Sequence, residues 1–501
     1  MGLEKDVAKI GKLSTVYMLG MIAPQVIGLV LLRVFTSYLD PAQMDITMLA
    51  NRLATPIGVF VQLGLWSALK MHYFRTAEAD RARLVRTVLL GQLVQGIALC
   101  CVLSVVGLWV ADALMPNLPL GRKYVLILWL MTVWSCLFVA ILQMATGVLQ
   151  LLERAAASVG LNLLGYVFQA GLGVAAVVGL GWQGFGRYGT TFIASVLAAI
   201  VSFRVVWRLG GAGFDFPVFK RMLRTGLTFV PHALSGLLAL TIGSWLLAKL
   251  DPGGSLAIYG IAVGFVQLVD LPMFSFGNAA YPTLARLMSD GSREAMRQQA
   301  RLYTLLVIAV VALNLGVYLF APTAIWLLTA PKYHGAMALV GILVFGWMFS
   351  GMYLIVSQPV FFFGGGLWLA MATASSTVVS VALAICLIPR YGMYGAAWSM
   401  VGSHATAFVV ASMASYYLYR LPWQVSHILR IFAGAAALCL LNVWLSPKVP
   451  VGWDVPIKML IFAGLLPALW LTGAVTAAEI RWAGNLGLTT LRSFVPILNP
   501  K

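Results

Sequence analysis

The 501-residue sequence is 61% apolar and only 10% charged, with a mean hydropathy of +0.93. Soluble globular domains carry about 25% charged residues, so a soluble protein of this length is excluded. The net charge is +18, but no soluble basic stretch is long enough to form a nucleic-acid interface. The basic excess fits the cytoplasmic loops of a membrane protein instead.

Apolar blocks of about twenty residues recur along the chain, and each is long enough to cross about 30 Å of hydrocarbon as a helix. We therefore predict an all-α polytopic membrane protein with about 14 transmembrane helices. All five cysteines fall within these spans, which predicts neither a disulfide nor a metal site, and we expect no cofactor. The predicted spans are 13–34, 46–68, 87–110, 123–146, 157–180, 188–207, 222–247, 257–284, 302–328, 335–358, 367–388, 393–418, 429–446 and 457–478.

The distribution of basic residues predicts the orientation. With the N-terminus in the cytoplasm, cytoplasmic segments hold 23 of the 33 Lys and Arg residues, outer segments hold nine, and Arg52 lies within a span. Lys and Arg are enriched in cytoplasmic loops, and an even number of spans returns the chain to the side on which it began. We therefore predict that both termini are cytoplasmic.

The chain also contains an internal repeat. The turn at 38–41 (YLDP) is matched at 249–252 (KLDP), and 186–189 (GRYG) is matched at 389–392 (PRYG). The similar offsets predict two parallel six-helix halves, an arrangement that transporters use to form a substrate site between repeats. We predict an N-lobe over 1–210, a C-lobe over 211–420, two extra helices in 421–478, and an amphipathic tail at 479–501 lying on the cytoplasmic membrane face.

Three segments carry a resemblance to a known family. They are 387–397 (LIPRYGMYGAA), 259–262 (YGIA) with its continuation at 280–284 (AYPTL), and 62–65 (QLGL) with the basic linker that follows. In this order and spacing they resemble the Wzx-type oligosaccharide flippases of the multidrug/oligosaccharidyl-lipid/polysaccharide exporter superfamily, over about residues 8–420.

The resemblance implies two pseudo-twofold-related lobes that rock around a central cavity. It also implies a bacterial inner (plasma) membrane location and a polyprenyl-diphosphate-linked glycan as substrate. Export of such a glycan would serve surface polysaccharide biosynthesis, for O-antigen or exopolysaccharide. Membrane lipids and polysaccharide assembly proteins would be the partners, and a proton or cation gradient could drive the cycle.

Two charged residues fall deep within the predicted spans, where each charge costs about 2.5–3.5 kcal/mol to insert. Arg52 could bind a diphosphate or an acidic sugar through its planar guanidinium, or it could reach the headgroups and backbone carbonyls. Asp270 could be an ion or proton site or a counter-charge to Arg52, or it could lock helices by bonding Ser275 or Asn278. A helical rise of 1.5 Å per residue places these two at depths about 10 Å apart, which argues against a permanent ion pair.

Three further residues are candidates for the cavity. His232 follows Pro231 and could contact the substrate or act at a hinge, or it could bond between helices. Arg33 at the outer end of the first span would contact lipid headgroups. Arg224 at the inner end of the seventh span would anchor that leaflet or meet an entering diphosphate.

The predicted function is therefore a flippase for a lipid-linked oligosaccharide, which works by alternating access and makes no bond. A multidrug or cation antiporter of the same superfamily is the first alternative, although it would need a cavity rich in carboxylates. A membrane glycan polymerase is the second, but such an enzyme needs a sizeable outer loop with acid/base groups, and every predicted outer loop is short.

Overall fold

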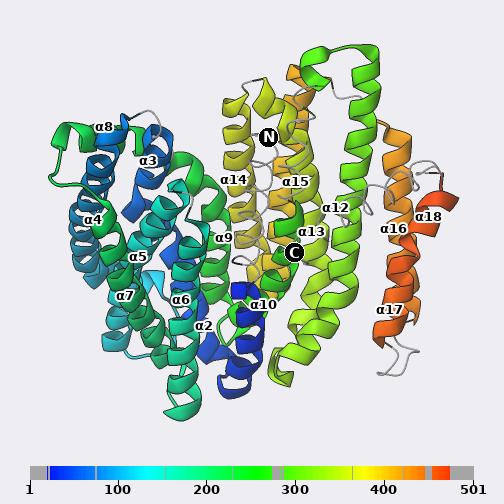
Figure 1. The fold of residues 1–501 in the computed structure, drawn as a ribbon. Helices are drawn as coiled ribbons and strands as arrows, with labels where there is room; N and C mark the ends of the chain where they lie inside the picture. The colour runs from blue at the N-terminus through cyan, green and yellow to red at the C-terminus, as the bar shows by residue number, and fades with distance from the viewer. Residues whose placement is uncertain are drawn as a thin grey trace, which may run out of the picture. The chain divides into compact units, whose positions relative to one another are not determined.

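The computed structural model describes residues 20, 23–73, 76–152, 154–227, 230–273, 284, 287–363, 365–420, 423–445 and 454–473, and within these it contains helices and no strands (Figure 1). The first helix is Ala23–Tyr38. It is followed by α2 (Pro41–Gln62), α3 (Leu65–Tyr73), α4 (Glu78–Leu114), α5 (Arg122–Leu151), α6 (Ala155–Val174) with a π-helical turn (Ala175–Gly179), α7 (Gly184–Leu209), α8 (Phe216–Leu227), α9 (Val230–Leu250), α10 (Ser255–Val266), α12 (Arg293–Leu328), α13 (Ala336–Phe362), α14 (Gly366–Tyr391), α15 (Met393–Leu418), α16 (Val425–Leu445), α17 (Asp454–Ala463) and α18 (Leu465–Leu471). Short 3₁₀ turns lie at Gln267–Val269 and Pro331–Tyr333.

Ten helical stretches in the described part of the chain are long and apolar enough to cross a membrane. The other four predicted spans overlap the helix Ala23–Tyr38, α2, α9 and α15. The helices α2, α9 and α15 have 22, 21 and 26 residues, which at 1.5 Å per residue is also long enough to cross the hydrocarbon. The protein is thus a multi-pass helical membrane protein, and we propose that it has fourteen transmembrane helices in all.

Several helices extend beyond their predicted apolar spans. The helix α4 begins nine residues before the predicted span at 87–110, and α12 begins nine residues before the one at 302–328. Their first turns carry acidic residues, Glu78 and Asp80 in α4 and Glu294 in α12, which interact favourably with a helix N-terminus. Hydropathy therefore marks the apolar part of each helix, whereas the helix itself begins earlier, in charged sequence.

The predicted span 46–68 is divided in the structure at Leu63 and Gly64. Both have positive φ angles, 44° and 64°, so α2 ends here and α3 leaves in a new direction. A Cβ on Gly64 would lie 2.3 Å from the carbonyl oxygen of Gly226. The glycine in this family-like turn is therefore required both for backbone conformation and for close approach to α8.

The second family-like turn also requires a glycine. Gly392, between α14 and α15, has a φ of 53°, and a Cβ there would lie 2.3 Å from a carboxylate oxygen of Asp251. Asp251 belongs to the repeated turn at 249–252. Two sequence motifs recognised separately are therefore in direct contact.

The described chain divides into two compact units. The first contains residues 1–260, 328–334 and 381–396, and the second contains 261–327, 335–380 and 397–501. In the first unit α5 packs against α2, α4, α6 and α7, and α2 also packs against α9. The lobes 1–210 and 211–420 remain a prediction about the transport cycle.

The second unit is held together by apolar contacts and one buried ion pair. Val356 of α13, Ala372 of α14 and Ala411 of α15 form one small core. Lys458 of α17 is buried and bonds Asp454 at 2.8 Å and Thr323 of α12 at 2.7 Å. This contact fixes the C-terminal helices to α12. The predicted tail at 479–501 lies outside the described residues.

Candidate functional site

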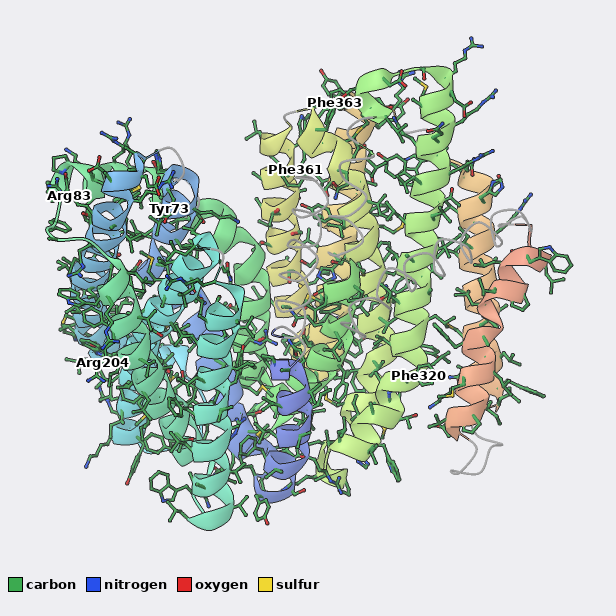
Figure 2. The ribbon with its side chains drawn as sticks, viewed as in Figure 1. Tyr73, Arg83, Arg204, Phe320, Phe361 and Phe363 are labelled. Carbon is green, nitrogen blue, oxygen red and sulfur yellow. The ribbon has the colours of Figure 1, made fainter. Side chains whose placement is uncertain are left out.

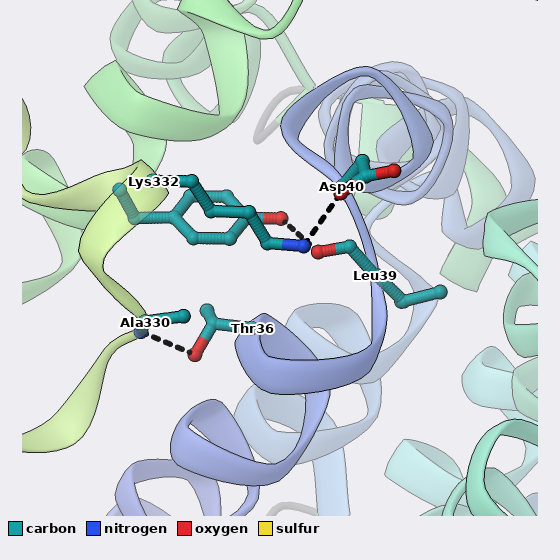
Figure 3. A network of polar contacts seen from close by, with 6 residues as sticks. Thr36, Leu39, Asp40, Ala330 and Lys332 are labelled. Carbon is teal, nitrogen blue, oxygen red and sulfur yellow. Dashed lines mark hydrogen bonds and ion pairs between the residues drawn. The ribbon is translucent and has the colours of Figure 1, made fainter.

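One end of the first unit is closed by a set of polar contacts that we call the clasp. It joins the end of the helix Ala23–Tyr38 to the 328–334 segment (Figure 3). The Ala330 amide donates to Thr36 Oγ1 at 3.1 Å, and the Tyr333 hydroxyl donates to the Leu39 carbonyl at 2.8 Å. Lys332 Nζ lies 2.6 Å from Asp40 Oδ1. The clasp therefore connects segments that are almost 300 residues apart in sequence.

Arg33 also belongs to the clasp. Its Nη1 donates to the Thr329 carbonyl at 2.6 Å. This predicted cavity residue thus holds a backbone carbonyl of the 328–334 segment. The orientation predicted from the loop charges would put this end of the unit outside the cell, and on that prediction the clasp is a candidate outer gate.

The clasp contacts differ in strength. Thr36 and Tyr333 are fully buried, so each hydrogen bond is worth about 1 kcal/mol and would leave an unpaired polar group if one partner were removed. The Asp40 side chain is 75% exposed, and an ion pair at such a position contributes about 0–1 kcal/mol. The buried hydrogen bonds therefore hold the clasp more firmly than its ion pair does.

A buried carboxylate reinforces the same end of the unit. Asp45 in α2 accepts hydrogen bonds from the Gly254 amide at 2.9 Å and the Ala257 amide at 2.7 Å. Gly254 directly precedes α10 (Ser255–Val266) and Ala257 lies in its first turn, where N–H groups have no partner within the helix. Asp45 therefore caps α10 from a different helix, and its charge suits the positive end of the helix dipole.

Arg52 lies on α2, two turns beyond Asp45 and half-buried. The Arg52 backbone carbonyl accepts a hydrogen bond from Thr241 Oγ1 of α9 at 3.3 Å. The Arg52 side chain interacts electrostatically with the side chain of Tyr259 in α10. Its guanidinium forms no hydrogen bond or ion pair with any described residue. A cation at this depth without a carboxylate is suited to an anionic ligand.

A cavity with both apolar and polar lining residues lies on another face of α2, between the helix Ala23–Tyr38, α6 and α7. Its volume is about 830 Å³ including its open mouth, and Asn51, Gln169 and Arg187 are among the residues that line it. A second cavity of about 780 Å³ is also lined by Asn51 and Gln169 and extends along α6 and α7 to Asn162 and Ser195. Because the two share part of their lining, we treat them as one and call it the α6–α7 track.

Arg187 lies at one end of the α6–α7 track. Its guanidinium stacks on Phe35 with 4.0 Å between the guanidinium carbon and the ring centroid. Its Nε is buried and has no hydrogen-bond partner among the described residues, and the same holds for the buried Thr47 hydroxyl. None of the residues lining the track is an Asp or a Glu. The site therefore carries one uncompensated positive charge.

In the second unit, Asp270 is held by Trp347. Trp347 Nε1 donates to Asp270 Oδ1 at 3.0 Å, and the Trp347 ring packs edge-on against His404 with centroids 5.0 Å apart. His404 Nδ1 lies 3.1 Å from the Gly346 carbonyl, so this histidine bonds between helices. Asp270 thus has a neutral partner, while Ser275 and Asn278, the partners considered from sequence, lie outside the described residues.

The remaining predicted site residues lie elsewhere. His232 is in α9, and its side chain lies outside the described residues. Arg224 is exposed on α8, a short helix that packs against α3 and α4. Figure 2 shows Tyr73 and Arg83 at this same end of the first unit, and Arg83 pairs with Asp215 at 3.5 Å. The predicted orientation would make this end the cytoplasmic one, and Arg224 remains a proposed leaflet anchor.

Sequence reasoning missed Arg187, Asn51 and Gln169 as possible binding groups, and it also missed the clasp residues Lys332 and Tyr333. Arg187 was assigned to an outer loop because the predicted span began at 188, whereas α7 begins at Gly184. Thr191 and Ser195 follow Arg187 at helical spacing, and this pattern could have indicated a polar helix face. No local pattern indicates the clasp.

The family model for polysaccharide biosynthesis proteins matches residues 10–288, which is more than half of the chain. The chain belongs to this polysaccharide biosynthesis family. The match confirms the predicted family resemblance. No curated protein matches this chain significantly.

Solved structures show the same fold. The lipid II flippase MurJ in an inward closed conformation matches with a TM-score of 0.69 at 12% identity, covering 91% of this chain and 98% of MurJ. An outward-facing multidrug resistance MATE transporter matches with a TM-score of 0.53 at 17% identity, covering 82% and 95%. A MOP transporter from Pyrococcus furiosus, described as having a binding pocket of reverse polarity, matches with a TM-score of 0.54 at 16% identity, covering 82% of this chain and 95% of that transporter. At these identities the likeness establishes the fold alone.

Proposed function

We propose that this protein flips a polyprenyl-diphosphate-linked oligosaccharide across the bacterial inner membrane for surface polysaccharide biosynthesis. Membership of the polysaccharide biosynthesis family is the observation that carries the proposal. MurJ, which has a similar fold, is a flippase for lipid II, and we extend that kind of cargo to this chain by analogy.

The charges within the first unit support an anionic cargo. Arg52 and Arg187 both lie in helices of this unit without an ion pair to a described residue. A multidrug antiporter for organic cations would be served by carboxylates, but the described carboxylate of α2, Asp45, is already committed to two backbone amides. We therefore assign Arg52 the role of binding the diphosphate, with its planar guanidinium matched to the phosphate oxygens.

The proposed cycle uses the clasp as the outer gate. In alternating access, one side of the carrier must close while the other opens. The glycan head enters from the cytoplasm while the clasp is formed, and breaking the clasp releases the head to the outside. The polyprenyl tail stays in the lipid throughout, so no covalent bond changes.

The energy source is a separate proposal that rests on Asp270. A half-buried carboxylate bonded only by the neutral Trp347 among the described residues can gain or lose a proton or cation during the cycle. We expect Asp270→Asn to reduce the dependence of transport on an ion gradient, as measured in proteoliposomes with imposed gradients. Transport rates that respond to the gradients as the wild type does would assign Asp270 a structural role.

Deletion of the gene provides the direct test of the flippase function. We expect the deletion strain to accumulate a polyprenyl-diphosphate oligosaccharide on the cytoplasmic leaflet, and a plasmid copy to restore export. A control strain that lacks the first glycosyltransferase should accumulate nothing. A deletion strain with normal surface polysaccharide and no accumulated lipid-linked glycan would refute the proposal.

A further inference from the structure

We propose that the α6–α7 track binds the sugar portion of the cargo and selects a saccharide that carries a carboxylate, which Arg187 binds. This inference rests on the proposed flippase function and specifies the class of glycan. It concerns a face of α2 different from the one that carries Arg52, so the two cations have different ligands.

The first support is the number of polar side chains in the track that have no hydrogen-bond partner among the described residues. The side chains of Asn51, Gln143, Asn162 and Tyr166 form no hydrogen bond with any described residue, although they line the cavity. Polar side chains within a membrane span are costly unless they face a polar partner or a water-filled space. Amides and hydroxyls can both donate to and accept from sugar hydroxyls, and they add no net charge.

The second support is the arrangement of these groups along two helices. Asn162, Tyr166 and Gln169 follow one another at intervals of four and three residues, which places them on one face of α6. On α7 the lining continues from Arg187 to Ala198, eleven residues or about 16 Å of helix at the usual rise. The track is thus longer than a single sugar ring and has its charge at one end.

The third support is the charge balance. Arg187 is the one charged residue lining the track in the described part of the chain, so the site matches a ligand with one negative charge. A guanidinium binds a carboxylate through two parallel hydrogen bonds, and stacking on Phe35 holds its plane in place. A diphosphate would bring more negative charge than the single cation of the track can balance, so a carboxylate is the better match.

The test uses the purified full-length protein and lipid-free oligosaccharides. The probes are a panel of short oligosaccharides that each contain one uronic acid, together with the same compounds after reduction of the carboxyl group to an alcohol. Binding is measured by titration calorimetry. We expect the wild type to prefer at least one acidic compound over its reduced partner by about tenfold or more, because hydrogen bonds to charged groups are the strong ones.

Variants locate the preference. Arg187→Gln should bind the acidic and reduced compounds equally, and Arg187→Lys should keep part of the preference because it keeps the charge but loses the planar fork. The control is Arg122→Gln, which removes an exposed arginine paired with Asp112 outside the track and should leave the preference intact. Asn162→Ala should weaken the binding of the acidic and the reduced compound by a similar factor of about three to ten. This variant tests the track even if Arg187→Gln does not fold.

Three outcomes would overturn the inference. They are equal or absent binding of every acidic and reduced pair by the wild type, an unchanged preference in Arg187→Gln, and displacement of the sugar by inorganic diphosphate in an Arg187-dependent manner. Failure of the flippase function would be seen separately, because the deletion strain would then accumulate no lipid-linked glycan whatever the purified protein binds.

Discussion

The clasp and the α6–α7 track use the helix Ala23–Tyr38 in opposite ways. At the clasp, Thr36 of this helix and the adjoining Leu39 carbonyl each have a partner in the 328–334 segment. Phe35, the residue before Thr36, lines a cavity together with Leu31 and Leu32 of the preceding turn. In this cavity Arg187 and Thr47 keep buried polar atoms without a described partner. Partnered polar groups stabilise one conformation, whereas unpartnered ones provide a site for a ligand.

The largest effect should come from locking the clasp. We expect Thr36→Cys together with Ala330→Cys, in a variant whose five native cysteines are replaced by alanine, to form a disulfide that arrests glycan export completely. The residues are joined by a hydrogen bond in this structure, and transport requires them to separate. Export is followed by surface polysaccharide staining before and after addition of a reductant, which should restore it.

Each single cysteine variant serves as a control and should export normally with or without oxidant. Full export by the cross-linked double variant would show that the clasp is not a gate. The clasp would then be a structural contact only.

The next effect concerns an unpartnered cation. Arg52→Ala should reduce export by at least about a hundredfold at an unchanged membrane level, since it removes two charge-assisted hydrogen bonds to the diphosphate, each worth about 1.5–3 kcal/mol. Arg52→Lys should retain part of the activity. Export is measured together with the amount of protein in the membrane. Normal export by the alanine variant would remove Arg52 from the binding site.

A partnered carboxylate should instead affect stability. Asp45→Ala leaves the Gly254 and Ala257 amides without an acceptor, at a cost of about 1–3 kcal/mol for each buried group. We expect a lower melting temperature in detergent, and Asp45→Asn should lose less because its amide oxygen can still accept. Equal melting temperatures for wild type and Asp45→Ala would mean that α10 is capped by another group.

The smallest effect should distinguish the contacts within the clasp. Lys332→Ala removes an exposed ion pair and should change stability by less than about 1 kcal/mol. Tyr333→Phe removes a buried hydrogen bond and should cost about 1 kcal/mol or slightly more. Denaturation of the two variants side by side provides the measurement, and the reverse order would assign the main role to the ion pair.

Much of the fold could be predicted from sequence because hydropathy and turn motifs are local properties. Gly64 and Gly392 lie in two of the three segments that carried the family resemblance, and their positive φ angles and close contacts explain why glycine is needed there. The ends of the helices could not be obtained in this way. Apolar residues begin only after Asp45 and Arg187, so both were assigned to loops, whereas α2 and α7 begin several residues earlier.

The candidate site was predictable only in part for the same reason. Arg52 stood out as a charge inside an apolar block, but its neighbours Thr241 and Tyr259 come from distant helices. The Asp270–Trp347 bond and the clasp likewise join segments without any shared sequence pattern. Pro41 directly after Asp40 is the local sign that α2 begins early, because proline favours the first turn of a helix.

The sequence separation across the clasp has a consequence for biogenesis. Thr36 meets Ala330 only after 294 further residues have been synthesised. A ribosome adds about 5–20 residues per second, so the end of the first helix waits for at least about 15 seconds, already inserted in the bilayer, before its partners emerge. During this interval Arg33, Thr36 and the Leu39 carbonyl depend on water and lipid headgroups for hydrogen bonds. Translation that stalls before residue 334 therefore leaves an inserted intermediate that cannot close this end.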